Sequence, residues 1–487
     1  MTVSSRVPSS PRVPLVAGLL LVVATAAFAR AAVLFGGTAP TVAAQVALSV
    51  VGLAGAALLW RRDDRAAFLA VVVAAVAARL MLLPLDPLHS NDVYRYLWDG
   101  RDLLHGVNPY VTAPSSPALA ALRRDDWLYA HIDWANVPTL YPPLDLALYA
   151  LGAALDGRHL FAIKSVLLLG DLGTIAVLAA GLRRAGLPLG RLAVYAWNPL
   201  VITEFAHGGH EEAWAVFWIV AALVALRAER PTASALSLAA AALTKLYPLA
   251  FVPVFFAARR TWHAAAIAGA TVVLAYLPFF LWSDDALGFL HAFAYGYRFN
   301  DSLHELVGTG GSIALFGLAV AAAVLARLRG ARLAALIFLL ELAYLLCSPN
   351  VYPWYATIFP AIAPLVPYGL RGAWRPLTLG TLAWTALTPL SYADTWVFAQ
   401  GSAGDAALHA VEYAPLAAGL ALALHALLWT ERVRTFAALS SALASLRPRP
   451  RRPRRFVVTA RTERRFEARV DLRLDAPHDA ESREARP

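Results

Sequence analysis

Long apolar segments recur along almost the entire chain, and this pattern restricts the fold more than any other feature. They begin near Leu15 and continue to Trp429, and many approach the roughly 20 residues that carry a helix across a hydrocarbon core of about 30 Å. Backbone groups inside a bilayer must hydrogen-bond within the protein, so repeated apolar segments of this length favour a helical bundle. Because 59% of the residues are hydrophobic and only 15% are charged, the chain is predicted to be an all-α polytopic membrane protein.

We expect about 12 to 14 transmembrane helices, with boundaries uncertain by several residues. The expected spans lie near residues 14–35, 41–60, 66–85, 160–181, 191–206, 212–228, 232–244, 246–258, 262–282, 311–328, 333–347, 355–369, 376–391 and 413–430. The single Cys347 excludes a disulfide within the chain and a cysteine-based zinc site.

The short connections between these spans are rich in arginine and alternate with longer polar loops. The basic connections are residues 61–65, 183–191, 227–230, 258–260, 327–332 and 371–375. The positive-inside rule places them in the cytoplasm, together with both termini. The loops rich in acidic and aromatic residues then face outward, and the polar chemistry of the chain is predicted on that side.

Residues 141–155 are the ambiguous segment, because counting them as a span would move the basic connection 183–191 to the outer side. The segment is short, begins with an aromatic-Pro-Pro sequence and carries Asp145. We therefore predict a helix that lies along the outer interface.

The C-terminal tail is polar and strongly basic, with six arginines among residues 447–455. Such a composition predicts a disordered cytoplasmic segment that lies against anionic membrane lipids, and we do not expect a nucleic-acid partner. The predicted organisation is N-terminal transmembrane helices (1–85), an outer catalytic loop with interfacial helices (86–158), a transmembrane bundle with outer loops (159–435) and the tail (436–487).

The first large outer loop contains the sequence LHSNDVYRYLWDGRDLLHGVNPY, residues 88–110. Ser90 and Asn91 are plausible caps for a short helix, Asp92 to Leu104, which Gly106 would close. Within it, Arg95 and Asp99 are spaced to pair with each other, and together with Arg101 and Asp102 they would form a solvated, self-paired face. Asp92 differs because it follows a span directly and has no cation four residues onward.

Five segments in order resemble the GT-C superfamily of membrane glycosyltransferases: NDVYRYLWDGRDLLHGVNPY, WANVPTLYPP (134–143), WNPLVITEFAHGGHEE (197–212), LTKLYPLAFVP (243–253) and SPNVYPWY (348–355). Within it, the chain is most similar to bacterial polyprenyl-phosphate-mannose-dependent mannosyltransferases. The resemblance implies transfer of a hexose, mannose in that family, from a polyprenyl-phosphate donor to a glycan or lipid-linked acceptor. It also implies an inner-membrane protein with an outward active site and a catalytic carboxylate at the position of Asp92.

Sugar transfer from a lipid phosphate requires a base for the acceptor hydroxyl and cations for the leaving phosphate. Asp92 is the candidate base. The candidate phosphate ligands on the outer side are Lys245, Arg298, His207 and His210. Lys245 is one of only two lysines in the chain, and a structural role remains its alternative, either in separating two short apolar segments or in neutralising Asp171 or Glu204.

Aromatic side chains in these segments are candidates for stacking on a sugar or lining a lipid groove, namely Tyr94, Tyr141, Tyr352 and Trp354. Interfacial Tyr and Trp are also common without a ligand. No cofactor is required by the sequence. Several GT-C members use a divalent cation held by paired carboxylates in the first loop, but here Asn91 precedes Asp92. If a cation is bound, Glu211 and Glu212 (or Asp284 and Asp285) would have to provide the second acidic motif.

A membrane transporter is the main alternative, since it would also have many spans and a basic net charge. The sequence shows no convincing internal repeat, and the intramembrane charges Arg30, Asp171 and Glu341 are scattered. A flippase or a ligase of lipid-linked sugars also remains open, the ligase depending on a pair formed by Arg298 and His304.

Overall fold

The computed structural model describes residues 10–37, 39–124, 126–258, 261–366, 372–392 and 403–446. Within these ranges the regular elements are helices, and an isolated β-bridge joins Phe299 and Asn350. The predicted all-α class is therefore confirmed. The chain forms two units, Met1–Leu427 and Leu428–Pro487, and the architecture below is that of the first unit.

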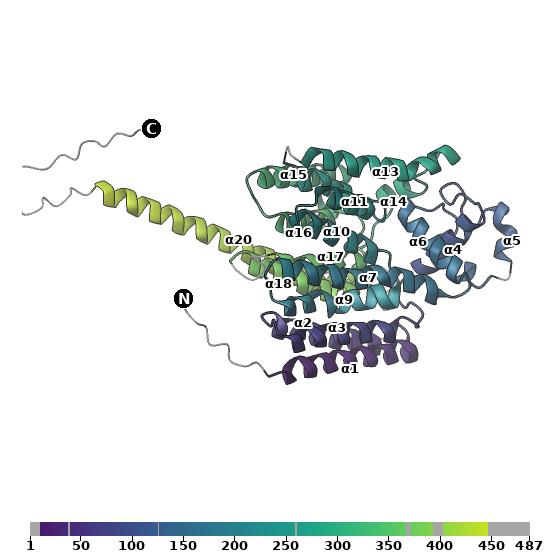
Figure 1. Cartoon of the computed structure of the whole chain (residues 1–487), viewed down its shortest axis with the longest axis horizontal. Coiled ribbons are helices and arrows are strands. Elements are labelled where there is room, and N and C mark those ends of the chain that lie inside the picture. The colour runs from purple at the N-terminus through teal and green to yellow at the C-terminus, as the bar shows by residue number, and fades with distance from the viewer. Residues whose placement is uncertain are drawn as a thin grey trace, which may run out of the picture. The chain divides into compact units, whose positions relative to one another are not determined.

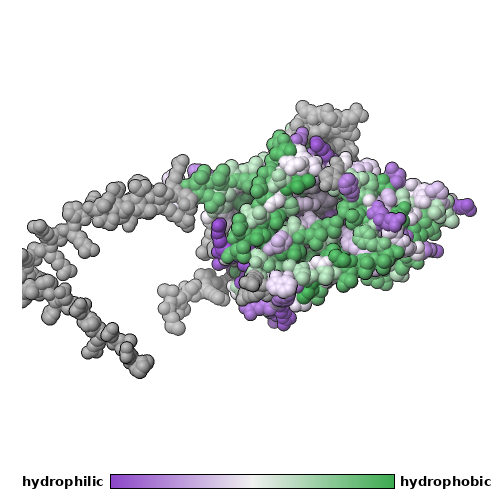
Figure 2. Space-filling model, turned by 90° about the horizontal axis from the view of Figure 1, so that it is seen from above, coloured by the Kyte–Doolittle hydropathy of each residue, from purple (hydrophilic) through white to green (hydrophobic). Residues whose placement is uncertain are grey.

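Among the described residues, seven helices are long and apolar enough to cross a membrane. They are α1 (Arg12–Phe35), α2 (Ala39–Leu59), α3 (Arg65–Leu82), α7 (Leu160–Arg184), α13 (Trp262–Trp282), α15 (Leu303–Leu328) and the part of α20 (Ala403–Leu446) from Ala407 to Thr430. Apolar residues cover most of the helical body, and hydrophilic residues gather mainly toward its ends (Figure 2). Both observations agree with a polytopic membrane protein.

The other predicted spans form short or interrupted helices. The short ones are α10 (Glu212–Arg227), α11 (Pro231–Ala242), α16 (Leu333–Cys347) and α18 (Trp374–Leu387). The predicted span 191–206 is divided into η3 (Leu189–Leu192), α8 (Ala193–Ala196), α9 (Pro199–Val201) and η4 (Ile202–Gly208). The span 246–258 is divided into η5 (Tyr247–Phe251) and α12 (Val252–Phe255), and the span 355–369 into η7 (Pro353–Thr357), α17 (Ile358–Ile362) and η8 (Ala363–Leu365). The short helix η9 (Thr388–Tyr392) follows α18. Prolines recur in these segments, and proline removes a backbone donor that a continuous helix needs.

The predicted outer loop folds into α4 (Asp92–Leu104), η1 (Pro117–Leu119), α5 (Ala120–Arg123), η2 (Tyr129–His131) and α6 (Pro143–Leu155). These elements gather at one end of the helical body (Figure 1), and α6 packs against α4 and α7. A Cβ on Gly100 of α4 would lie 2.3 Å from the carbonyl oxygen of Tyr149, so glycine permits this close approach of α4 to α6. With 13 residues α6 is too short for an ordinary span.

Two of the basic connections meet at the same end of the first unit. The amide of Gly190 donates to the carbonyl oxygen of Arg62 over 2.8 Å, and the amide of Leu189 donates to Asp63 Oδ1 over 3.1 Å. Arg62 also donates to the carbonyl oxygen of Ser10, just before α1, which starts at the end of the body remote from α4 (Figure 1). Residues 61–65 and 183–191 are thus on one side, as expected if residues 141–155 do not span.

A buried ion pair lies inside the bundle. Arg79 of α3 pairs with Asp171 of α7, and the hydroxyl of Tyr195 donates to the same carboxylate over 2.8 Å. Asp171 is therefore neutralised by Arg79, so the expectation that Lys245 neutralises Asp171 is wrong. The reason is geometric, because α3 and α7 bring the guanidinium and the carboxylate together in the core.

At the C-terminal end, helix α20 continues to Leu446, past residue 436 where the sequence predicted the disordered tail to begin. The remaining part of the predicted tail, residues 447–487, lies outside the described residues.

Candidate active site

The predicted helix of the outer loop is confirmed as α4, with Asp92 in its first turn. Asn91 is the residue before the helix but makes no capping hydrogen bond with its side chain, whereas Ser90 Oγ accepts a hydrogen bond from the Asp92 amide over 3.2 Å. Gly106 has φ of +73° after the helix end, as predicted. The Asp92 side chain is 33% exposed and lines a cavity of about 300 Å³.

This cavity, called here the polar cavity, is enclosed by segments far apart in sequence. Its walls come from the start of α4, residues 133–141, the region of α14 (Leu290–Gly296), residues 352–355 and Tyr392. Backbone bonds from Phe299 to Pro349 and from Val351 to Phe299 hold two of these segments together. The lining combines Asp92, Asp133, Arg95, Glu211 and Lys245 with many aromatic rings.

His210 lies behind Asp92 because of a tight turn after the π-helix η4. Gly209 has φ of +75°, and this left-handed residue returns the chain so that His210 Nε2 lies 3.2 Å from Glu204 Oε2. His210 Nδ1 lies 4.0 Å from Asp92 Oδ2, and its ring stacks on Trp354 with centroids 3.9 Å apart. Glu204 is therefore occupied by His210 and by the Tyr392 hydroxyl, so the expectation that Lys245 neutralises Glu204 is also wrong.

These contacts shift the pKa values of Asp92 and His210. Burial raises the pKa of the Asp92 carboxyl above its ordinary value, and Glu211 and Asp133 add to this while His210 and Lys245 oppose it. Burial by itself would lower the pKa of His210, but Glu204 and Asp92 outweigh it, so the pKa is raised. A carboxylate of increased basicity is suited to accept a proton in the cavity.

Lys245 lies between α11 and η5, as predicted, and contacts two carboxylates. Its Nζ lies 2.6 Å from Glu211 Oε1 and 2.6 Å from Glu212 Oε1. The Tyr96 hydroxyl also donates to Glu211, and the ammonium lies 4.9 Å from the ring centroid of Tyr355. A structural role for Lys245 is therefore supported, with Glu211 and Glu212 as its partners in place of Asp171 and Glu204.

Three of the four predicted aromatic residues line the polar cavity, namely Tyr141, Tyr352 and Trp354. Tyr352 stacks on Trp354 with centroids 4.6 Å apart. Tyr94 is buried and stacks on His131 at 4.8 Å, outside the cavity lining.

The predicted phosphate ligands do not all converge. Lys245 lines the cavity, and His210 lies beneath it against Asp92. His207 is buried, with its ring edge-on to Phe28 at 5.6 Å. Arg298 is exposed and is not among the residues that line the polar cavity, although its neighbours Tyr297 and Phe299 are.

Arg95 lines the polar cavity, a position that the sequence analysis did not predict. It pairs with Asp99 at 2.7 Å, as its spacing predicted, but also donates to the carbonyl oxygens of Trp134 and Val137. The expected solvated face is wrong, because Asp99 and Asp102 are each 1% exposed. Burial and the nearby Asp99 raise the pKa of Asp102 to about 7. The spacing of Arg95 from Asp92, three residues along a helix, is the signal that would have placed both on one face.

A divalent cation was left open in the sequence analysis, with Glu211 and Glu212 as candidate ligands. His210, Glu211 and Glu212 have ligand atoms within 4.8 Å of one another, and their chemistry would suit a cation. The Lys245 ammonium, however, already contacts both carboxylates, and a metal ion would have to displace it. The arrangement fits the ammonium better than a metal.

A second cavity of about 330 Å³ adjoins the first and is called here the apolar cavity. Its lining includes Leu290, Ile313, Phe316 and Tyr344. Both cavities share Leu140, Tyr141, Lys245, Phe293 and Tyr355 in their linings. Lys245 thus lies on a wall between a polar and an apolar compartment.

The described helices thus bring a carboxylate-bearing cavity next to an apolar one. In a comparison with known families, residues 11–261 match the family model of the alpha-(1->6)-mannopyranosyltransferase N-terminal domain, MptA/B family. The match spans more than half of the chain, and the protein belongs to this family of mannosyltransferases, as the resemblance to GT-C enzymes predicted. Neither a curated protein nor a solved structure matches the chain.

Proposed function

We propose that the protein transfers mannose from a polyprenyl-phosphate donor to a hydroxyl of a glycan or lipid-linked acceptor, at the outer face of a bacterial inner membrane. The observation that carries this proposal is the position of Lys245 on the wall shared by the two cavities. A donor of this kind has an apolar chain, a charged phosphate and a polar sugar. The apolar cavity, Lys245 and the polar cavity offer matching surroundings in that order.

Asp92 is proposed as the general base. It takes the proton of the acceptor hydroxyl while the acceptor oxygen forms a bond to the sugar carbon C1, and the C1–oxygen bond to the phosphate breaks with its electron pair on phosphate. His210 and Glu204 position Asp92 through the contacts described above. Tyr141, Tyr352 and Trp354 provide faces on which a sugar ring can stack.

Lys245 is proposed to stabilise the charge that develops on the phosphate. An ammonium has three N–H donors, and two of them are accounted for by Glu211 and Glu212. The third remains for a ligand in the cavities, to which 17% of the side chain is exposed. Family membership favours this transferase over the transporter, flippase and ligase alternatives. In the ligase alternative, His304 lines the apolar cavity but Arg298 does not.

The donor assignment predicts a clear result with purified protein. We expect radiolabelled mannose to pass from polyprenyl-phosphate-mannose to an α-mannan acceptor, and no transfer from a nucleotide-linked mannose, because the cavity pair fits a lipid chain. Product is measured by separation of labelled acceptor from donor. Transfer from the nucleotide donor alone would contradict the proposed donor class, and transport of donor into vesicles without product would favour a flippase.

The proposed orientation is tested by cysteine labelling in a Cys347→Ala background. Ser115 and Arg184 are both exposed, the first in the outer loop and the second in the last turn of α7. We expect Ser115→Cys to react with an impermeant maleimide in cells with a permeabilised outer membrane, and Arg184→Cys to react only after lysis. The reverse pattern would place the polar cavity in the cytoplasm.

A further inference from the structure

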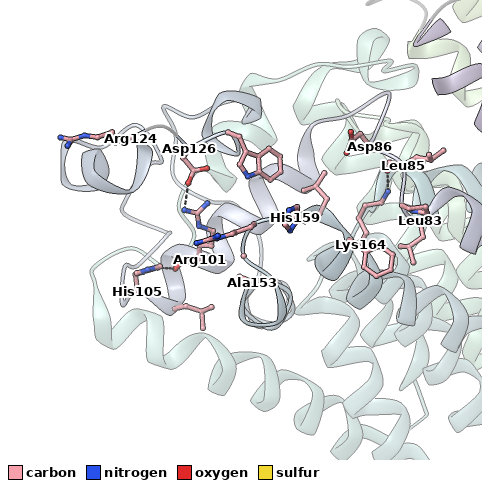
Figure 3. A pocket seen from close by; sticks show the side chains of 17 residues that line it. Leu83, Leu85, Asp86, Arg101, His105, Arg124, Asp126, Ala153, His159 and Lys164 are labelled. Carbon is pink, nitrogen blue, oxygen red and sulfur yellow. Dashed lines mark hydrogen bonds and ion pairs between the residues drawn. The ribbon is translucent and has the colours of Figure 1, made fainter. Parts of the chain in front are cut away.

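A third cavity lies apart from the two cavities assigned above, and the proposed function does not use it. It has a volume of about 960 Å³. It is formed by the end of α3, the second half of α4, the segment around Arg124, and the connection from α6 into α7 (Figure 3). We call it the basic cavity because four cationic side chains line it against two carboxylates.

Two of the cations have no carboxylate partner among the described residues. Arg124 and Arg158 are exposed at the cavity. Arg101 pairs with Asp126 at 2.5 Å, and the imidazole of His159 contacts Asp156 at 2.9 Å. Asp86 lies beside Lys164 (Figure 3), so the excess positive charge of the lining lies on the two exposed arginines.

Lys164 is the most informative residue of the basic cavity, because it is only 1% exposed. Its Nζ donates to the carbonyl oxygen of Leu85 over 2.5 Å, and that carbonyl is the one acceptor within hydrogen-bond distance among the described residues. A lysine amine has more N–H donors than this one bond uses, so Lys164 has unused hydrogen-bonding capacity. In Figure 3 it lies beside Asp86 and Leu85, across the cavity from Arg101 and Asp126.

The remaining lining indicates what kind of anion fits. Leu83 and Leu85 follow the apolar helix α3, and Leu160 and Phe161 begin the apolar helix α7. Phe161 is 56% exposed. The basic cavity therefore combines cations with apolar residues at the ends of two candidate membrane spans, the level at which lipid headgroups meet acyl chains.

We propose that the basic cavity binds an anionic membrane lipid: Lys164 offers its unused donors to the lipid phosphate, Arg124 and Arg158 attract the headgroup through their positive charge, and the residues after α3 and at the start of α7 lie against the acyl chains. A free phosphate shares the charge but lacks the chains. The proposal is independent of the donor site, since Asp92 and Lys245 do not line this cavity.

The test uses the full-length protein in nanodiscs of phosphatidylcholine and a fluorescent phosphatidylglycerol as the probe. We expect saturable binding of the probe, displaced by unlabelled phosphatidylglycerol but not by added phosphatidylcholine or inorganic phosphate. Arg124→Ser with Arg158→Ser should weaken binding on the order of tenfold or more, because each basic residue near a lipid surface contributes appreciably. Lys164→Met should weaken it further if that variant folds.

Arg184→Ser is the matched control, since it removes one exposed charge from the other end of α7. Equal probe binding by the control and by the double arginine variant would overturn the proposal. So would displacement by inorganic phosphate at the same concentration as by lipid, because that result would assign the cavity to a soluble anion.

Discussion

Replacement of Asp92 by Asn is expected to lower turnover by about 10²- to 10⁴-fold, the usual contribution of a general base. Asn keeps the size of the side chain but cannot take up the acceptor proton. Donor affinity should be preserved, because the phosphate is proposed to lie at Lys245. Transfer rate and donor binding are measured on the same membranes.

Asp133→Asn is the matched control for this experiment. Asp133 lines the same polar cavity and is exposed, so its loss removes a carboxylate from the cavity without removing the proposed base. Only a small change in turnover is expected. Near-normal turnover by the Asp92 variant, or a larger loss at Asp133, would refute the assignment.

The acid side of the pH profile provides a second readout of Asp92. A base works only when ionised, so transfer should fall as the pH drops through the Asp92 pKa. Because burial raises that pKa above the ordinary carboxyl value, the fall should occur at a higher pH than for an exposed aspartate. This fall at acidic pH should be absent from the residual activity of Asp92→Asn. If the variant instead loses activity at the same pH as the parent protein, the fall belongs to another group.

Local features of the site could be predicted from the sequence. The span before Asp92, the helix it begins, the left-handed glycine at its end and the Arg95–Asp99 pair follow from periodicity, capping preferences and spacing within one short segment. The family resemblance likewise depended on ordered motifs that can be read along the chain.

Features that depend on packing between distant segments could not be predicted. Lys245 and Glu211 are 34 residues apart, and they meet only because the end of α11 packs near the turn after η4. For the same reason the sequence could not distinguish two candidate tyrosines: Tyr141 lines the polar cavity, whereas Tyr94 stacks on His131 outside it. Burial of Asp99 and Asp102 depends on how the outer loop folds around α4, which composition alone does not reveal.

Removal of the Lys245 charge is expected to have the largest effect on stability. Lys245→Met leaves Glu211 and Glu212, which are almost fully buried, without their shared cation. Breaking a buried ion pair from one side typically costs about 3 to 5 kcal/mol of the free energy of unfolding. Thermal unfolding of the detergent-solubilised protein should therefore shift strongly downward, whereas Lys245→Arg, which keeps the charge, should shift much less.

Stability and donor binding can be separated at this position by a compensated variant. Combining Lys245→Met with Glu211→Gln and Glu212→Gln removes all three charges together, so most of the lost stability should return. Donor affinity should remain low in this variant if the ammonium contacts the phosphate. It should be intermediate in Lys245→Arg, because a planar guanidinium presents its donors differently from an ammonium. Parental donor affinity in both variants would assign Lys245 solely to the neutralisation of Glu211 and Glu212.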